Sequence, residues 1–239
     1  MSFFKAKLKN RILRARLGGR ELPPLAAANL RALDRLDPAS PALDHSFVVI
    51  DLETTGLDPA SDRVVSVGAV RIQEGRVRLG DRFAELINPG RDIPPESIKI
   101  HGIKPDMIEK ARRAAEVFQD FLDFLAGDIL VAHYAAFDLH FINRTMRGLY
   151  GFPLQNLVLD TVLMCQALVL PSDPYGINRN QARCSLEELA TRFGLPQGGR
   201  HSSLGDALLT AMILQRLLGR LEQVGPARLR DLMRAAARW

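Results

Sequence analysis

Two acidic residues, Asp51 and Glu53, directly follow the apolar run 47–50. The run predicts a buried β-strand, and residues two apart on a strand point to the same face. Two neighbouring carboxylates repel each other unless a cation lies between them, and hard divalent cations prefer such oxygen ligands. The pair therefore indicates a metal site. The alternative interpretation is a solvated strand end that begins a turn.

Three further residues with suitable chemistry lie far along the chain. Asp138 lies four residues into a predicted helix, and Asp206 lies near the start of a later helix, with His201 in the loop before it. Each alone has an ordinary explanation, since an acid in a first turn favours the helix dipole and a loop histidine is often only a polar residue. Four carboxylates from three elements and one histidine together favour a two-metal hydrolase.

Longer motifs surround these residues. They read VVIDLETTGLDP at 48–59, AHYAAFDLHFI at 132–142 and HSSLGDA at 201–207. In type and order they resemble the DnaQ-like, or DEDDh, family of 3′→5′ exonucleases. The strings HGI, LDT and SLEELATRFGL fit the same pattern, and the resemblance covers about residues 46–220. Tyr134 departs from it, because asparagine is common there, and so do Ser202 and Ser203.

The resemblance implies a role for each of the five residues. Asp51 would bridge two divalent metal ions, Mg²⁺ or Mn²⁺. Glu53 and Asp206 would complete one metal site, and Asp138 would support the other. His201 would be the general base that deprotonates the attacking water, and the ordinary imidazole pKa of about 6.5 suits that task.

The resemblance also implies how substrate is held. Backbone groups of Leu52, Thr54 and Thr55, and the Thr55 hydroxyl, would bind the terminal nucleotide. Phe137 would stack on a base and His101 would line the same cleft, although core packing and a plain loop role are the respective alternatives.

The expected reaction is hydrolysis of phosphodiester bonds at DNA 3′ ends, in proofreading or repair, with release of nucleoside 5′-monophosphates. Single-stranded or frayed 3′ ends are the expected substrates. The same chemistry on RNA ends is an alternative, because the catalytic groups act on the phosphate and not on the sugar. A non-catalytic binding or assembly module is a third reading, and the intact set of five residues disfavours it.

The elements expected to position these residues form an α/β domain. After the first strand, 63–73 and 77–87 alternate as strands, with a turn at Glu74-Gly75, which predicts an antiparallel meander. Strands at 128–133 and 157–160 then alternate with helices, so the sheet is expected to be mixed, and RNase H-like by resemblance. A proline-rich loop is expected at 88–102. Helices are expected at 105–110, 114–125, 135–147, 161–168, 185–193, 203–221 and 226–238.

The chain outside the resemblance is basic. We expect residues 1–45 to form a helical extension and linker, with helices in 1–20 and 25–36, 46–222 to be the exonuclease domain, and 223–239 a basic C-terminal helix. The formal charge of +5 arises within residues 1–45, and the first twenty residues hold seven basic and no acidic side chains. The extension is expected to tether the enzyme without taking part in catalysis. Nucleic acid, a DNA polymerase or other replication or repair protein, and an anionic membrane are the partners considered, the membrane being disfavoured.

Composition sets the remaining expectations. Hydrophobic residues make up 47% and charged residues 25%, which are values of a globular chain with a real core. The longest runs without charge have 12 residues, too short to span a membrane. Cys165 and Cys184 fit no metal-type spacing and are expected to be reduced thiols in a cytoplasmic protein.

Overall fold

A mixed sheet forms the centre of the computed structural model, which describes residues 3–170, 181–223 and 225–238. Within the described residues the sheet has six strands in the order β3-β2-β1-β4-β5-β6. The strands are β1 (Phe47–Thr54), β2 (Val64–Gln73), β3 (Arg76–Leu86), β4 (Ile129–Ala132), β5 (Val158–Asp160) and β6 (Ala237–Arg238). β1, β2 and β3 form an antiparallel meander, β4 runs parallel to β1, and β5 runs parallel to β4. The predicted mixed sheet is confirmed.

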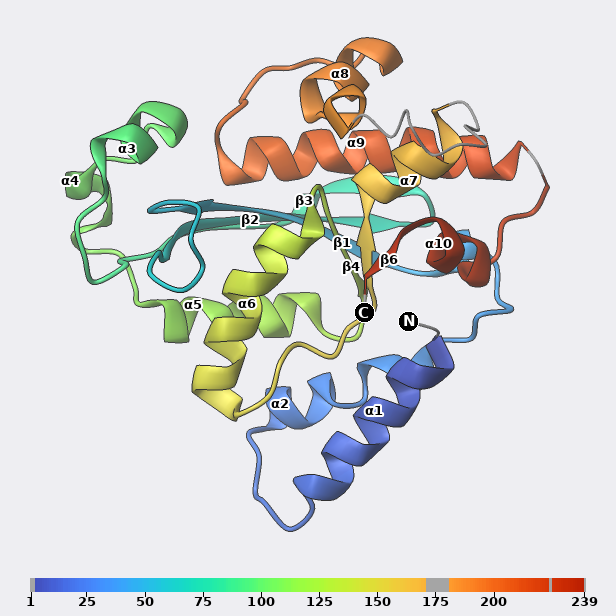
Figure 1. Cartoon of the computed structure of the whole chain (residues 1–239), viewed down its shortest axis with the longest axis horizontal. Coiled ribbons are helices and arrows are strands. Elements are labelled where there is room, and N and C mark those ends of the chain that lie inside the picture. The colour runs from blue at the N-terminus through green and yellow to red at the C-terminus, as the bar shows by residue number, and fades with distance from the viewer. Residues whose placement is uncertain (1–2, 171–180, 224, 239) are drawn as a thin grey trace.

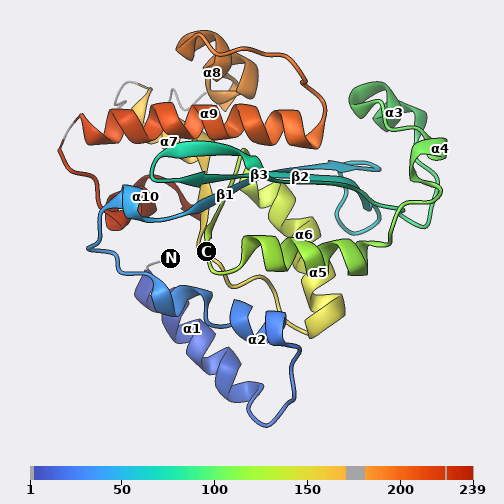
Figure 2. The same cartoon turned by 180° about the vertical axis from the view of Figure 1, so that it is seen from behind.

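Helices cover both faces of this sheet (Figure 1), and Figure 2 shows the same layers from behind. On one side lie α1 (Phe3–Arg16), α2 (Pro24–Asn29), α5 (Ala114–Leu125) and α6 (Ala135–Tyr150). A second set of helices packs in the hydrophobic cluster on the other face of the sheet. They are α7 (Thr161–Leu168), α8 (Leu186–Phe193), α9 (Ser203–Glu222) and α10 (Leu229–Ala236). The short helices α3 (Pro95–His101) and α4 (Pro105–Ile108) lie beyond one end of the sheet.

Alternation along β1 divides the core into two layers. Phe47 and Val49 pack in the cluster that includes α9, whereas Val48 and Ile50 pack in the cluster that includes α5 and α6. Since side chains on a strand alternate between faces, Asp51 continues the face that α9 covers. The hydrophobic pattern of one strand thus determines which helix the first acidic residues meet.

The hairpin between β2 and β3 turns at Glu74-Gly75, as predicted. Both residues have positive φ, 53° and 68°. This is the left-handed conformation that two-residue hairpin turns require. The turn therefore fixes the register of the meander.

The segment expected as a proline-rich loop, 88–102, contains the helix α3. Pro95 occupies the first helical position, where a missing N–H is harmless, and Gly102 ends the helix with φ of 71°. The expectation was wrong here because proline can begin a helix as well as prevent one. Similarly, the expected helix at 25–36 is divided into α2 and the 3₁₀ turn η1 (Ala32–Arg35), and the C-terminal helix ends in the short strand β6.

The two cysteines form a disulfide. Cys165 lies in α7 and Cys184 ends the 3₁₀ turn η3 (Gln181–Cys184), and both are fully buried. The expectation of two reduced thiols is therefore wrong, because the chain folds back so that η3 lies on α7. Their separation of 19 residues gave no sign of this approach.

The N-terminal extension packs on the rest of the chain. The Asn10 amide donates a hydrogen bond to Gln155 at 2.9 Å, and the Asn29 amide donates one to Asn156 at 2.6 Å. Another 3₁₀ turn, η2 (Ala42–Asp44), precedes β1, and the Ala42 N–H donates to Ala227 at 2.9 Å. Among the described residues, no helix combines the length and the apolar composition needed to cross a membrane.

Candidate active site

The carboxyl end of β1 carries the first two acids. Asp51 and Glu53 are half-buried, whereas Leu52 and Thr54 between and after them are buried on the opposite face. Asp51 pairs with Gly68 and Glu53 with Ser66 on the antiparallel neighbour β2. Strand alternation therefore presents both carboxylates on one face, as the sequence predicted.

The start of α9 lies directly against β2 opposite these acids. A side chain at Gly68 would collide with the backbone of Ser203 and Leu204, so only glycine permits this approach. The hydroxyls of Ser66 and Ser203 share a hydrogen bond of 2.6 Å across the contact. The close packing places Asp206, in the first turn of α9, next to β1.

Asp51, Glu53 and Asp206 form one cluster. Their nearest carboxylate oxygens all lie within 4.8 Å of one another, although the three come from two separate elements. Carboxylate oxygens at such spacing fit a hard divalent cation such as Mg²⁺ or Mn²⁺. The cluster is thus a group of residues that could hold a metal ion.

Asp138 joins this cluster from the first turn of α6. It is buried, and its negative charge raises the pKa of Asp51. A backbone hydrogen bond from Leu52 favours the charged form of the Asp138 carboxyl. The structure therefore brings all four acidic residues of the sequence hypothesis to one edge of the sheet.

Asp51, Glu53 and Asp138 have raised pKa values, because they are buried and lie near other negative charges. Burial, followed by the charge of Asp138, raises the pKa of Asp51 well above its usual range. Burial and the charge of Asp206 raise the pKa of Glu53 to about 7, and burial raises the pKa of Asp138 to about 8. A cation among these oxygens would relieve both the burial penalty and the repulsion.

An arginine that the sequence interpretation missed already supplies one positive charge. The Arg200 guanidinium donates to Asp206, and it also donates to Glu187 of α8 at 3.0 Å. Its charge offsets part of the rise that burial and the neighbouring acids cause in the pKa of Asp51 and of Glu53. The sequence offered one signal, since Arg200 is adjacent to His201 in an otherwise uncharged loop at 193–205. The Asp206 carboxylate therefore already has a positively charged partner, which is consistent with a site that binds a cation.

His201 lies in the same loop, with its side chain exposed. Its backbone has φ of 62°, and its N–H donates to Asp206 at 3.3 Å. The imidazole is not among the residues that line the pocket beside Asp51. The backbone of His201 therefore contacts the acid cluster through Asp206, whereas its side chain is exposed to solvent.

A pocket of about 560 Å³ opens beside Asp51 and Asp138. Its other walls come from the β1–β2 loop, the start of α6 and the start of α8. They consist of Leu52, Leu57, His133, Tyr134, Phe137, Ser185, Leu186, Glu187 and Arg200. Phe137 was predicted to contact substrate, whereas Leu57, Tyr134 and the residues of α8 were not.

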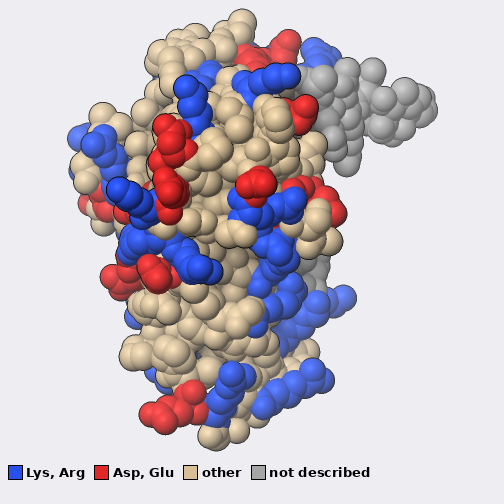
Figure 3. Space-filling model, turned by 90° about the vertical axis from the view of Figure 1, so that its left-hand side faces the viewer, with Lys and Arg blue, Asp and Glu red and all other residues tan. Residues whose placement is uncertain are grey.

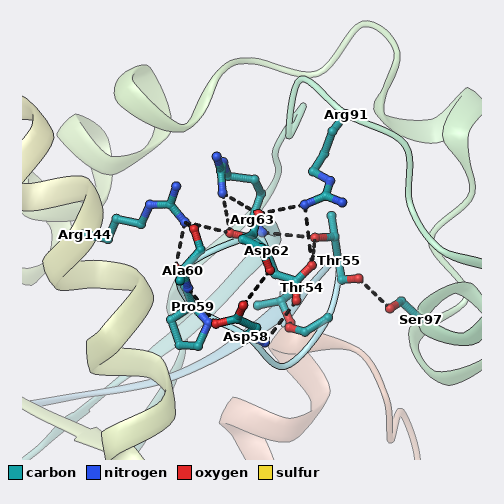
Figure 4. Close-up of polar contacts among 12 residues, drawn as sticks. Thr54, Thr55, Asp58, Pro59, Ala60, Asp62, Arg63, Arg91, Ser97 and Arg144 are labelled. Atoms are coloured by element: carbon teal, nitrogen blue, oxygen red, sulfur yellow. Dashed lines mark hydrogen bonds and ion pairs between the residues drawn. The ribbon is translucent and has the colours of Figure 1, made fainter.

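The loop between β1 and β2 is held rigidly beside this pocket (Figure 4). The Thr55 hydroxyl donates to Asp62 at 2.8 Å, and Arg144 of α6 donates to the carbonyls of Pro59 and Ala60 at 2.7 and 2.8 Å. The Thr54 hydroxyl donates to the Gly56 carbonyl at 2.6 Å. Both threonine hydroxyls therefore support the loop. The Thr55 backbone is engaged as well, since its N–H donates to the Arg63 carbonyl at 2.8 Å and its carbonyl accepts from the Ser97 hydroxyl at 2.9 Å.

His101 lies at the end of α3 and lines a different pocket. It is buried, and its Nδ1 accepts the Ile103 N–H at 3.0 Å. Burial lowers the pKa of His101, and a hydrogen bond with the Thr54 backbone offsets part of this effect. It lines a second pocket, of about 300 Å³, together with Ser66 and Ser203 at the start of α9.

This arrangement defines the class of protein. An antiparallel meander followed by parallel strands, flanked by helices and carrying carboxylates from β1, α6 and α9 at one edge, is an RNase H-like fold with an acidic site. The chain belongs to the exonuclease family RNase_T, whose model matches residues 48–214.

Individual relatives agree with the family. The chain is 42% identical over 183 residues to a DNA polymerase III subunit epsilon-like protein of Rhodobacter capsulatus, covering 75% of this chain and 25% of that protein. It is 40% identical over 173 residues to the DNA polymerase III subunit epsilon of Treponema pallidum, covering 70% of this chain and 76% of that protein. Thus the chain spans a quarter of the first relative and about three quarters of the second.

The fold is also that of a solved nuclease domain. The structure of the nuclease domain of 3′hExo, a DEDDh family member, bound to rAMP, matches with a TM-score of 0.63 at 17% sequence identity. The match covers 79% of this chain and 97% of that domain. At this identity the likeness concerns the fold, and it confirms the RNase H-like architecture expected from the motifs.

Proposed function

We propose that this protein is a metal-dependent 3′→5′ exonuclease that removes nucleotides from DNA 3′ ends in proofreading or repair. The observation that carries the proposal is the convergence of Asp51, Glu53 and Asp206 within 4.8 Å, next to Asp138 and an open pocket. The family and the epsilon-subunit relatives support the same reaction.

The four acids would hold two divalent cations, Mg²⁺ or Mn²⁺. Asp51, central in the cluster, would contact both cations, with Glu53 and Asp206 completing one site and Asp138 supporting the other. Two such cations supply an activated water and stabilise the charge on the phosphate during its in-line displacement. The carboxylates would release their protons and Arg200 would leave Asp206 when the cations bind.

His201 would act as the general base. A proton has to leave the attacking water, and the imidazole of His201 would accept it. The loop that carries His201 is joined to Asp206 by its backbone N–H, so the base would stay near the cluster. The products would be nucleoside 5′-monophosphates.

Substrate would enter as an unpaired 3′ end. The backbone from Leu52 to Thr55 and the side chain of His101 would hold the terminal nucleotide, and Phe137 would stack on a base in the pocket. A base pair at the end would have to be opened at a cost of a few kcal/mol, which favours single strands and frayed ends.

A digestion assay tests this proposal. A 5′-labelled single-stranded DNA should shorten one nucleotide at a time from its 3′ end, only with Mg²⁺ or Mn²⁺, and should be protected by EDTA. A circular strand and a strand with a 3′-phosphate should resist digestion. Rapid cutting of the circle would mean an endonuclease and would overturn the proposal. An RNA strand of the same sequence measures the exoribonuclease alternative, and preferred digestion of RNA would replace DNA as the substrate.

The N-terminal extension would bind a partner, either a DNA polymerase or another replication or repair protein. Phe4, Leu8 and Ile12 are 76%, 46% and 47% exposed and recur every four residues on the outer face of α1. We name these three residues the α1 stripe. Lys and Arg side chains predominate on the lower right of Figure 3, at the level where Figure 1 places α1 and α2. An apolar stripe with basic neighbours suits a protein groove with an acidic rim.

A further inference from the structure

Tyr134 has an unusual backbone for its side chain. Its φ and ψ of 61° and 45° are left-handed, and it immediately precedes α6 at the end of β4. Glycine adopts this conformation readily because it has no Cβ, and asparagine tolerates it because its short polar side chain can hydrogen-bond locally, whereas a bulky residue is rare there. A tyrosine at this position therefore introduces strain that an asparagine would avoid, which points to a use for the ring.

The left-handed turn presents the ring to the pocket beside the acids. Tyr134 is 38% exposed, and it lines this pocket with Phe137 and Leu57. Asp51 and Asp138 line the same pocket, so the ring lies on a wall of the space where a phosphate would meet the acids.

A rigid neighbour supports the ring. The rings of His133 and Tyr134 meet edge to face, with centroids 5.0 Å apart and planes at 86°. His133 is buried, and its Nδ1 shares a hydrogen bond of 2.8 Å with the Thr161 hydroxyl. An aromatic side chain held in this way loses little freedom when a flat ligand stacks on it.

Nucleobases are flat ligands that stack on such rings irrespective of sequence. We propose that Tyr134 stacks on a base upstream of the 3′-terminal nucleotide and so determines how firmly the strand is held. This inference rests on the proposed nuclease function and adds a substrate contact to it.

The upstream position follows from the two pockets. The proposed function gives the terminal nucleotide a contact with His101, which lines the pocket shared with Ser203 of α9. Tyr134 lines the other pocket, together with Leu186 and Glu187 of α8. A strand whose end lies on the His101 side and whose scissile phosphate lies at the acids would bring an earlier base to Tyr134.

Two substitutions separate stacking from backbone strain. Tyr134→Asn removes the ring and suits the left-handed backbone, whereas Tyr134→Phe keeps the ring. For a single-stranded oligonucleotide, Tyr134→Asn should raise KM by about 5- to 100-fold, the equivalent of one base–aromatic stack, with kcat changed less than about twofold. Tyr134→Phe should stay close to the wild type. Because strain is relieved, Tyr134→Asn should also raise Tm by about 2–4 °C.

Substrates that lack one base identify the contact. An abasic site at the second or third position from the 3′ end should raise the KM of the wild type to about the KM of Tyr134→Asn. An unchanged KM for Tyr134→Asn, or an advantage that disappears only with an abasic terminal nucleotide, would overturn the proposal.

A binding measurement keeps this inference separate from the proposed activity. Fluorescence anisotropy with labelled single-stranded DNA in Ca²⁺ gives Kd without turnover, and Tyr134→Asn should raise Kd by the same factor as KM. If the wild type binds the strand but does not hydrolyse it in Mg²⁺ or Mn²⁺, the proposed function fails while the ratio of Kd values still decides the role of Tyr134. If the wild type does not bind the strand at all, or if the wild type and Tyr134→Asn bind it with equal Kd, the inference fails.

Discussion

The carboxylates of Asp51, Glu53 and Asp138 are difficult to ionise together. Burial and mutual repulsion raise the pKa of Glu53 to about 7 and that of Asp138 to about 8, and raise the pKa of Asp51 as well. Arg200 offsets part of this repulsion through its contact with Asp206. Ionising these carboxyls without a bound cation is therefore unfavourable, and a bound cation would reduce that cost.

This electrostatic state predicts how stability depends on pH. In the unfolded chain these carboxyls titrate near pH 4, so between about pH 4 and 8 the folded protein binds more protons than the unfolded one. The stability of the metal-free protein should therefore fall as pH rises through this window. Thermal unfolding in EDTA between pH 5 and 8 measures the effect, and Mg²⁺ should raise Tm most at pH 8.

The matched control for the pH experiment is Asp51→Asn, which removes one of the repelling charges while keeping a similar side-chain volume. Its metal-free Tm should decrease less between pH 5 and 8 than that of the wild type. A wild-type Tm that stays constant or rises over this range would contradict raised pKa values of these carboxyls in the folded protein.

At the scale of elements, the site depends on how closely α9 approaches the meander. Gly68 on β2 is the contact point, because a Cβ there would collide with the backbone of Ser203 and Leu204. The contact fixes the distance from Asp206 to Asp51 and Glu53, which lie on the next strand. The geometry of the cluster is therefore a property of packing as much as of the acidic residues.

Gly68→Ala should lower activity much more than the addition of a single methyl group suggests. Overpacking at this contact should destabilise the protein by about 1–3 kcal/mol, and a shift of about 1 Å in Asp206 should reduce kcat about 100-fold. Gly80→Ala on β3 is the matched control, since no atom lies within 4 Å of its added Cβ. Full activity of a folded Gly68→Ala protein would contradict the role given to this contact.

Sequence patterns predicted most elements, because each carried a local signal. The alternation along 63–73 and 77–87 predicted the hairpin that β2 and β3 form, and the motifs predicted acids that the structure brings together. The missed features depend on tertiary contact. The helix α3 begins at a proline, and the Cys165–Cys184 disulfide closes only when η3 folds on α7. The Arg200 contact arises because the loop that leads into α9 folds against the first turn of that helix. A left-handed residue at Tyr134 is likewise visible only in the backbone.

At the scale of the whole molecule, the N-terminal extension combines an attached inner face with a free outer face. Ala6 and Asn10 are buried against the rest of the chain, whereas the α1 stripe is exposed. Deleting residues 1–44 would remove these buried contacts and the hydrogen bond between Asn29 and Asn156, and could therefore destabilise the protein. Substitutions on the exposed face of α1 test the partner role without this effect. In Figure 1, α1 lies below the sheet, whereas α9, whose first turn carries Asp206, lies above it.

Phe4→Ser combined with Leu8→Ser and Ile12→Ser should leave kcat on a short oligonucleotide and Tm nearly unchanged. It should weaken binding to the replicative polymerase subunit of the same organism, measured by sedimentation, by more than about tenfold, since three apolar contacts are lost. Leu79→Ser is the control, because Leu79 is 62% exposed on β3, far from α1. Equal polymerase binding by the triple variant, or loss of binding to anionic vesicles instead, would contradict a protein partner.

The central claim is that the acid cluster works as a divalent metal site for hydrolysis at 3′ ends. The most direct measurement compares the wild type with Asp51→Ala on a 5′-labelled single strand, with and without Mn²⁺. The wild type should produce a ladder shortened from the 3′ end only with the metal. Asp51→Ala should be slower by at least about 10³-fold, the loss expected when several kcal/mol of charge stabilisation disappear. It should keep a native circular dichroism spectrum, because removing one acid relieves repulsion. Near-native digestion by Asp51→Ala, or digestion by the wild type in excess EDTA, would contradict the account.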